Sequence, residues 1–221
     1  MSADLRHIDT WIFDLDNTLY PLETGFMRLI EERMTDYFER FSGLPRDEAR
    51  ALQKRYYKAY GTSLAGLIAE HDIDAHAFLA EVHDVPLDSL SPDPALRGAL
   101  ARLPGRRLVF TNGSSAHARR VLAHLALDDL YEGVFASEAA DLLPKPAEAT
   151  FARMIAAFHV DPAAAAFFED SERNLEPAAR LGMTAVLVGD HAAASTASFV
   201  HHRTAALAPF LDGVQVQEIA A

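Results

Sequence analysis

Two aspartates, Asp14 and Asp16, directly follow the apolar run IDTWIF at residues 8–13. They stand two positions apart, so in an extended chain both side chains point to the same face. Two carboxylates this close repel each other, and burial in a medium of low dielectric constant strengthens the repulsion. The pair therefore requires a source of positive charge near the end of this segment.

Other polar residues stand directly after further short apolar runs. The runs LVF at 108–110 and AFF at 166–168 are followed by Thr111, Asn112, Gly113, Glu169 and Asp170. Lys145, in the segment LLPKP, stands in a loop just before an expected helix. It is one of three lysines, with Lys54 and Lys58, in a chain that otherwise uses arginine. The residue types that can do chemistry thus collect where apolar runs end.

These apolar runs alternate with helix-like stretches along most of the chain. TAVLVGD from residue 184 and GVFAS at 133–137 are further strand candidates. Apolar residues stand at helical spacing in two segments, SSAHARRVLAHLAL and EATFARMIAAFHV. Short apolar strands that alternate with helices are typical of a parallel sheet with helices on both faces. The predicted fold class is therefore α/β, with a Rossmann-like parallel core.

Residues 21–91 break this rhythm. Apolar residues recur there at helical spacing without an intervening strand-like run: Phe26, Leu29, Ile30, Met34, Tyr37, Phe38, Phe41, Leu52, Tyr56 and Tyr60. Asp93 before Pro94 is typical of a helix N-cap and its first helical residue, where the chain returns to the alternating pattern. The sequence predicts a core of residues 1–20 and 92–221, with residues 21–91 inserted as a small all-α cap.

In an open parallel sheet, ligands bind beyond the carboxyl ends of the strands, where these polar residues stand. The sheet would bring four carboxylates to one edge: Asp14, Asp16, Glu169 and Asp170. They cannot all stay ionised and unpaired. A divalent cation resolves the conflict, and oxygen ligands suit Mg2+ best. The sequence therefore predicts a magnesium site.

With a cation in place, one aspartate can attack phosphorus and form an aspartyl-phosphate. Asp14 is nearer the strand end and so more rigidly aimed, and we expect it to be the nucleophile. Asp16 would protonate the leaving oxygen and then deprotonate the attacking water. The expected reaction is the hydrolysis of a phosphate monoester.

The phosphoryl group would be held by residues from two other segments. Thr111 and Asn112 offer a hydroxyl and an amide, and Gly113 lets the backbone approach closely. Lys145 would stabilise the charge on the nucleophile and the transition state. Taken singly, TNG at 111–113 could be a plain turn and Lys145 a surface lysine. Their joint occurrence, in this order and at run ends, favours the phosphate site.

The histidines are expected to have structural or surface roles. His117 and His124 lie seven residues apart on one face of an expected helix, where they would pack or cap. His71, His76 and His83 fall in the helical insertion, and a surface position is expected for each, although one could touch substrate.

The amino-acid composition limits the kinds of molecule that this protein can be expected to bind. The formal net charge of −12 argues against nucleic acid or an anionic membrane, because both favour basic surfaces. Absence of cysteine excludes disulfides and thiolate metal sites. No apolar run approaches the roughly 18 residues that a membrane span needs, and the N-terminus lacks a signal pattern. A cytoplasmic enzyme is expected.

Four segments resemble, in chain order, the four motifs of the haloacid dehalogenase-like hydrolase superfamily: DLDNTLYP, TNG, KP and EDSERN. The resemblance covers the whole chain, since the helical insertion falls where that superfamily carries its small C1-type cap. It implies that Asp14 is the nucleophile and Asp16 the acid and base. It also implies that Mg2+ is bound by the Asp14 carboxylate, the Asp16 backbone carbonyl and Asp170. Glu169 would help to hold a metal-bound water, and Asn174 would support the metal or Lys145.

Longer strings are similar to the pyrimidine 5′-nucleotidase-like subfamily: DLDNTLYP, GTSLAGL at 61–67, VHD at 82–84, LPGRRLVFTNGSSAHARRVL and DLLPKP. The similarity implies hydrolysis of a pyrimidine nucleoside 5′-monophosphate such as UMP or CMP. Phosphatases of other small phosphates and phosphoglucomutase-like phosphotransferases share the motifs. Dehalogenases lack an acid/base aspartate two after the nucleophile, so Asp16 argues against them. Phosphonatases use a cap lysine, but Lys54 and Lys58 fit an exposed helix face.

Tyr20, at the expected hinge, and Thr62 and Ser63, in GTSLAGL, are candidate substrate contacts. The segment TS is equally typical of a helix N-cap. A rival from a different class is a receiver-like signalling module, which also gathers aspartates, a threonine and a lysine on a parallel sheet but stores the aspartyl-phosphate. Asp16 and the cap favour the enzyme, since a phosphate store needs neither an acid/base nor a lid.

Overall fold

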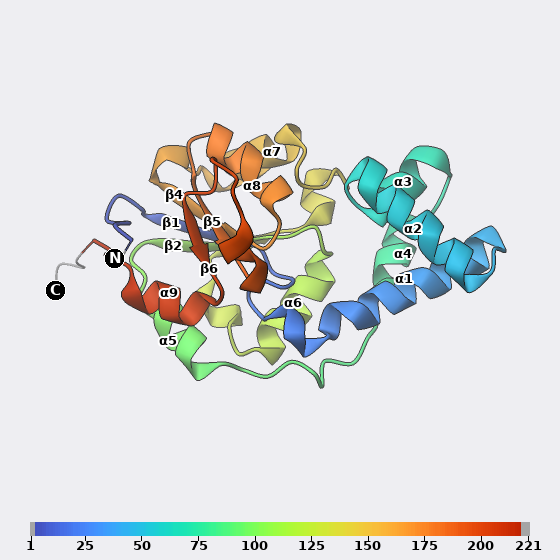
Figure 1. Ribbon diagram of the computed structural model, residues 1–221, viewed down its shortest axis with the longest axis horizontal. Helices are drawn as coiled ribbons and strands as arrows, with labels where there is room; N and C mark the ends of the chain where they lie inside the picture. Colours follow the sequence, from blue (N-terminus) through green and yellow to red (C-terminus); the bar gives the residue numbers. More distant parts are fainter. Residues whose placement is uncertain (1–2, 218–221) are drawn as a thin grey trace.

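The computed structural model describes residues 3–217, and its centre is a six-stranded sheet (Figure 1). All strand pairs are parallel, and the strand order is β3-β2-β1-β4-β5-β6. The strands are β1 (Thr10–Phe13), β2 (Arg106–Phe110), β3 (Gly133–Phe135), β4 (Ala165–Glu169), β5 (Thr184–Val188) and β6 (His202–Thr204). The expected α/β fold with a parallel core is confirmed.

Helices cover both faces of this sheet, with α7 and α8 above it and α5, α6 and α9 below it in Figure 1. Their bounds are α5 (Pro94–Ala101), α6 (Ser115–His124), α7 (Glu148–Phe158), α8 (Glu172–Arg180) and α9 (Leu207–Gly213). Alternate strand residues enter opposite layers, as the pleat requires. Trp11 and Phe13 belong to the hydrophobic cluster under α5, α6 and α9, and Ile12 to the cluster under α7 and α8.

Strand β1 lies in the middle of the sheet between β2 and β4, and all four of its residues are buried. The chain first adds β2 and β3 on one side of β1 and then crosses to add β4, β5 and β6 on the other. The boundary between β1 and β4 is therefore the topological switch point, where open α/β sheets bind ligands. The backbone N–H of Asp14 donates to the carbonyl of Phe168 at 2.9 Å, so the ends of β1 and β4 are locked together.

The segment between β1 and α5 forms a separate group of helices, on the right in Figure 1. This helical insertion contains α1 (Phe26–Ser42), α2 (Arg46–Tyr60), α3 (Ser63–Glu70) and α4 (Ala75–Val82). Some of the apolar residues found at helical spacing, such as Phe38 and Tyr56, are buried with Leu67 in a hydrophobic cluster of the insertion itself. Phe26 and Ile30 instead belong to the cluster under α5, α6 and α9. A core of this kind lets the four helices hold their arrangement beside the sheet.

Several local expectations can be compared directly with the elements. Asp93 caps α5 by accepting from the N–H of Ala95, with Pro94 at the first helical position as expected. The edge strand β6 has no counterpart among the expected strands, because its residues are polar and half-buried. Within residues 3–217, no helix is both long and apolar enough to cross a membrane.

Candidate active site

Lys145 is the centre of the polar residues at the carboxyl edge of the sheet. Its side chain is 1% exposed, and its ammonium group donates to Asp14 Oδ1, Glu169 Oε2 and the carbonyl of Phe110, each at 2.7 Å. Three donors thus meet three acceptors, and two of these acceptors are carboxylates. Both carboxylates keep the pKa of Lys145 raised although burial opposes its charge. Lys145 is therefore a buried cation that joins the ends of β1, β2 and β4.

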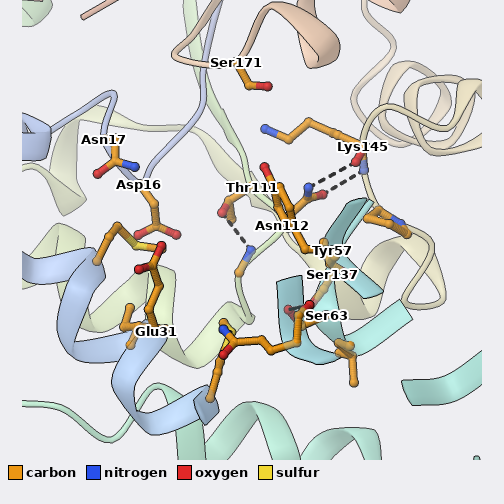
Figure 2. A pocket seen from close by; sticks show the side chains of 18 of the residues that line it. Asp16, Asn17, Glu31, Tyr57, Ser63, Thr111, Asn112, Ser137, Lys145 and Ser171 are labelled. Carbon is orange, nitrogen blue, oxygen red and sulfur yellow. Dashed lines mark hydrogen bonds between the residues drawn. The ribbon is translucent and has the colours of Figure 1, made fainter. Parts of the chain in front are cut away.

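The loop that carries Lys145 is fixed by Asn112, from the end of β2. The side-chain oxygen of Asn112 accepts the Lys145 N–H at 2.8 Å, and its amide nitrogen donates to the Lys145 carbonyl at 3.2 Å, as Figure 2 shows. The Asn112 side chain thus pairs with the N–H and the C=O of Lys145 as a neighbouring strand residue would. These two hydrogen bonds hold the main chain on both sides of the Lys145 Cα. The Asn112 amide, expected on the phosphate, has these backbone groups as its partners.

Three acidic side chains converge beside this lysine. Oxygen atoms of Asp14, Glu169 and Asp170, one from each carboxylate, all lie within 4.8 Å of one another. Burial, together with the charge of Glu169, raises the pKa of Asp14 to about 8 against the effect of Lys145. Burial likewise raises the pKa of Glu169 to about 7. Burial and the charge of Asp14 also raise the pKa of Asp170. The lysine alone does not balance this negative charge.

A divalent cation fits this donor set. Carboxylate oxygens are the hard ligands that Mg2+ prefers, and a second positive centre would relieve the repulsion that raises these pKa values. Asp14 and Asp170 have an oxygen left for a cation, since Lys145 contacts Oδ1 of Asp14 and Asn17 contacts Oδ2 of Asp170 at 3.4 Å. Glu169 is more fully engaged, because its second oxygen accepts the N–H of Ser171 at 3.2 Å.

Asp16 lies outside that three-carboxylate cluster and has different partners. Its Oδ1 accepts from the hydroxyl of Tyr20 at 2.6 Å and contacts Nε2 of His117 at 2.8 Å. Burial disfavours the carboxylate, but electrostatic interaction with His117 and hydrogen bonds from both neighbours lower the pKa of Asp16 to about 2. The two aspartates of the DLD segment therefore have opposite environments, with the proton favoured on Asp14 and disfavoured on Asp16.

The TNG turn at 111–113 faces the same space. The hydroxyl of Thr111 accepts the N–H of Gly113 at 2.9 Å, which folds the turn back on the end of β2. A Cβ atom at position 113 would lie 3.0 Å from Cδ2 of His117 and 3.2 Å from Oγ1 of Thr111. Glycine therefore leaves the space through which the Asp16 and His117 side chains meet.

These residues line one cavity of about 890 Å³ that continues under the helical insertion. Figure 2 shows Asp16, Thr111, Asn112 and Lys145 on the sheet side of this cavity. The facing wall comes from α1, α2 and α3 and includes Glu31, Gln53, Lys54, Tyr57 and Lys58. A cavity of this size holds a ligand larger than phosphate alone.

The expected substrate contacts divide into two groups. Thr62 and Ser63 line the cavity, where Thr62 caps α3 by accepting the N–H of Ala65 and Ser63 donates to the carbonyl of Gln53. Tyr20 is 3% exposed and directs its hydroxyl to Asp16; it is absent from the described lining of this cavity. Asn174, by contrast, does line the cavity.

Sequence reasoning missed His117 as a neighbour of Asp16. The surface position expected for His83 is wrong, because this ring is 8% exposed and stacks on His117. The sequence carried one usable signal: His117 stands four residues after Gly113, so one helical turn brings it back towards the TNG turn.

Known proteins resemble this chain in sequence over most of its length. A family model described as haloacid dehalogenase-like hydrolase matches residues 8–182. The fructose-1-phosphate phosphatase YqaB of Escherichia coli is 30% identical over 182 residues, which cover 79% of this chain and 93% of that protein. Phosphate metabolism protein 8 of Saccharomyces cerevisiae is 35% identical over 136 residues, which cover 56% of this chain. The match spans 42% of the yeast protein, so the yeast chain is much the longer of the two.

The fold is also shared with solved structures. The phosphatase structure from Thermococcus onnurineus superposes with a TM-score of 0.61 at 21% identity and covers 97% of this chain and 99% of its own. At this identity the likeness concerns the fold alone. It extends over the helical insertion as well as the sheet, since almost the whole of both chains is matched.

Proposed function

Because the chain belongs to the haloacid dehalogenase-like hydrolases, we propose that it is a magnesium-dependent phosphomonoesterase that works through an aspartyl-phosphate on Asp14. The observation that carries the proposal is the contact of Lys145 with both Asp14 and Glu169 at the switch point of the sheet. Such a buried cation lets an anionic nucleophile approach an anionic phosphate. The names of the two curated relatives, a phosphatase and a phosphate metabolism protein, support the same chemistry.

The reaction has two steps. The first needs Asp14 ionised and Asp16 protonated, which is the reverse of the protonation favoured in the site without ligands. A cation beside Asp14 would lower its pKa, and the negative charge of the phosphoryl group would raise that of Asp16. A carboxylate oxygen of Asp14 then bonds to phosphorus, the bond from phosphorus to the leaving oxygen breaks, and Asp16 gives that oxygen a proton. In the second, Asp16 takes a proton from water, the water oxygen bonds to phosphorus, and the bond to Asp14 breaks. Phosphate and the alcohol are the products, and both aspartates return to their starting protonation states.

Other residues hold the charges in place during these steps. Mg2+ would be held by the Asp14 and Asp170 carboxylates and the Asp16 backbone carbonyl, and it would supply positive charge to the phosphoryl oxygens. Glu169 supports Lys145 and adds negative charge beside the metal ligands. Thr111 would offer its hydroxyl to the phosphoryl group, and Gly113 lets the backbone approach that group closely.

The chain divides into a core of residues 1–20 and 92–221 and a cap of residues 21–91. In this proposal the cap covers the cavity and selects the leaving group. The separate hydrophobic cluster of α1–α4 supports this division. Thr62, Ser63 and Tyr57 are among the cap residues that line the cavity where the leaving group would lie.

The proposed substrate is a pyrimidine nucleoside 5′-monophosphate, and its support is the similarity of GTSLAGL, VHD and DLLPKP to the pyrimidine 5′-nucleotidase-like subfamily. An exposed aromatic ring in the cavity, Tyr57, offers a surface on which a base can stack. The second candidate is a small sugar phosphate, which the name of the Escherichia coli relative favours.

A panel of phosphate monoesters tests the proposal. Phosphate release would be measured with UMP, CMP, purine monophosphates, fructose 1-phosphate and glycerol phosphate, each with Mg2+ and with EDTA. The proposal expects Mg2+-dependent turnover, with the highest kcat/KM for UMP or CMP. Highest activity on the sugar phosphates would select the second candidate. Stable phosphorylation of Asp14 without turnover would instead identify a receiver-like phosphate store.

A further inference from the structure

The two oxygens of Asp16 have unequal surroundings. Oδ1 receives both available contacts, from the Tyr20 hydroxyl and from His117 Nε2, while no hydrogen bond to Oδ2 is found among residues 3–217. Asp16 lines the cavity, and Oδ2 lies 3.5 Å from the position that a Cβ at Gly113 would take. One oxygen is thus held by the protein and the other is left for the reacting atoms.

His117 is itself held on several sides. Its backbone N–H is capped by Ser114 Oγ at 3.2 Å, and its ring is 2% exposed. The ring lies parallel to that of His83, with centroids 4.2 Å apart and planes at 15°, and also parallel to that of Phe26, at 6.0 Å and 3°. A ring with stacked neighbours of this kind has little rotational freedom, so its Nε2 points steadily at Asp16.

The two stacking partners come from the two ends of the helical insertion. Phe26 is the first residue of α1, where the chain leaves the sheet, and His83 caps the end of α4, where the chain returns. Arg120, from the same helix as His117, donates to the carbonyls of His83 and Val85 on the returning segment. His117 therefore contacts Asp16 at one edge and both connections of the insertion at its faces.

We propose that His117 is a positioning residue: it holds Oδ1 of Asp16 so that Oδ2 faces the leaving oxygen, and the stack with Phe26 and His83 couples this orientation to the seating of α1–α4. The inference rests on the proposed phosphatase function. The residue acts through Asp16 and does not touch the phosphoryl group. Its loss should therefore affect the step in which a proton passes to the leaving oxygen and spare the attack of Asp14.

A matched pair of amide variants tests this role. In His117→Gln the amide nitrogen stands close to the former position of Nε2 and reaches Asp16, whereas in His117→Asn the same amide is one methylene shorter and does not. The probes are p-nitrophenyl phosphate, whose leaving group departs without a proton, and glycerol phosphate, whose alkoxide needs one. The quantity compared is kcat/KM, which reports the steps up to formation of the phosphoenzyme.

The expected result for His117→Asn is a fall of at least about 30-fold with glycerol phosphate and less than about 3-fold with p-nitrophenyl phosphate. His117→Gln should recover most of the activity on glycerol phosphate. His124→Gln is the matched control on the same helix and should behave as wild type. Within residues 3–217, the hydrogen bond found for its imidazole is to the carbonyl of Leu90 at 3.1 Å, away from Asp16. Thermal unfolding of each variant checks that the fold is retained.

Equal losses with both probes, or no loss with either, would overturn the positioning role. The role would also be overturned if His117→Gln had no higher kcat/KM on glycerol phosphate than His117→Asn. The reach of the hydrogen-bond donor would then be irrelevant. If His117→Asn does not fold, His117→Phe takes its place: it keeps the stacked ring and removes the donor. A wild-type protein that hydrolyses neither these probes nor any ester of the panel above refutes the phosphatase proposal itself, which is a distinct outcome.

Discussion

At the scale of single residues, the protein keeps several charges where water does not reach them. Lys145 and Glu169 are each 1% exposed and Asp14 is 6% exposed. Buried ionic groups of this kind add little net stability, because desolvation cancels most of their attraction. Their burial makes sense for chemistry instead, since low dielectric strengthens the action of Lys145 on any phosphate beside it.

Replacing the nucleophile should separate activity from stability. Asp14→Asn removes the attacking oxygen anion and should lower turnover by at least about 1,000-fold. It also removes one of the clustered negative charges, so the free energy of unfolding should stay the same or rise. Phosphate release and urea unfolding measure the two quantities. Asp88→Asn, an exposed residue, is the control; near-normal turnover by Asp14→Asn would contradict the role of Asp14.

The acidic cluster should make metal-free protein less stable as pH rises. Burial raises the pKa of Asp14 to about 8 and that of Glu169 to about 7, so the folded state binds protons more tightly than the unfolded chain does. The resulting stability is fully present below about pH 4 and is lost as pH rises through these raised values. A loss of about 2 kcal/mol would lower Tm by roughly 4–8 °C.

Thermal unfolding in EDTA between pH 7 and pH 9 measures this slope. Below that range His83, whose pKa burial lowers to about 3, contributes a stability change of the opposite sign. Added Mg2+ should raise Tm, and more strongly at pH 8 than at pH 5, because it binds the ionised carboxylates. Asp14→Asn should show a shallower slope. A Tm in EDTA that rises steadily with pH would show that these carboxylates are not strained in the folded protein.

Residue types and their order were enough to predict that polar side chains from distant segments gather at one edge of the sheet. Asp14, Lys145 and Asp170 come together because parallel strands present their carboxyl ends at one edge. The partners of each side chain were not predictable. Asn112 binds the backbone of Lys145, and His117 binds Asp16, because loop conformation and the seating of α6 decide these contacts. The spacing of His117 from Gly113 brings the ring towards the TNG turn but does not identify Asp16 as its partner.

At the scale of elements, strand and helix patterns were readable where burial is strong. Strand β1 is buried at every residue and reads as an apolar run, whereas β6 is half-buried, polar and at the sheet edge, so its pairing with β5 had no signal. The first two helices of the insertion, α1 and α2, were readable from the spacing of their apolar residues. The closeness of packing between these helices could not be read from the sequence, since it depends on side-chain contacts between helices.

The contact of α2 with α3 provides a test at this scale. A Cβ atom on Gly66 would lie 2.5 Å from Cβ of Tyr56. This clash can be relieved only if the backbone or the tyrosine ring moves. Gly66→Ala should destabilise the protein by about 1–3 kcal/mol, more than the gain in helix propensity.

Gly98→Ala in α5 is the matched control, because a Cβ there meets no atom within 4 Å. It should stabilise the protein by about 0.5–1 kcal/mol through helix propensity alone. Urea unfolding measures both variants. Equal behaviour of the two would show that α2 and α3 adjust without strain.

At the scale of the whole molecule, the net charge of −12 repels a phosphate ester before it reaches the cavity. Cationic side chains that line the cavity counter this field locally. Arg173, from the first turn of α8, is one of them, and its guanidinium lies 3.3 Å from the position of a Cβ built on Gly61 in the insertion. It therefore lies where the sheet unit and the helical insertion meet.

Two arginine variants separate local from overall charge. Arg173→Gln and Arg180→Gln change the net charge equally and lie on the same helix, but Arg180 pairs with Glu148 and is absent from the described lining of the cavity. Arg173→Gln should lower kcat/KM about tenfold, mainly through KM. Arg180→Gln should change it less than about twofold. If both variants lowered kcat/KM to a similar extent, the net charge of the protein, and not the charge inside the cavity, would control substrate binding.

The central place of β1 in the sheet has a consequence for biosynthesis. The first strand to leave the ribosome pairs with β4, whose last residues follow more than 150 positions later, as the bond from Asp14 to Phe168 shows. At about 5–20 residues per second, translation alone separates the two by roughly 8–30 s. During that interval β1 lacks its partner β4 along one edge, although β2 can already pair with the other, and the α1–α4 helices can fold on nearby partners. A nascent chain arrested before Ala165 should therefore carry a formed helical unit and no assembled acidic cluster.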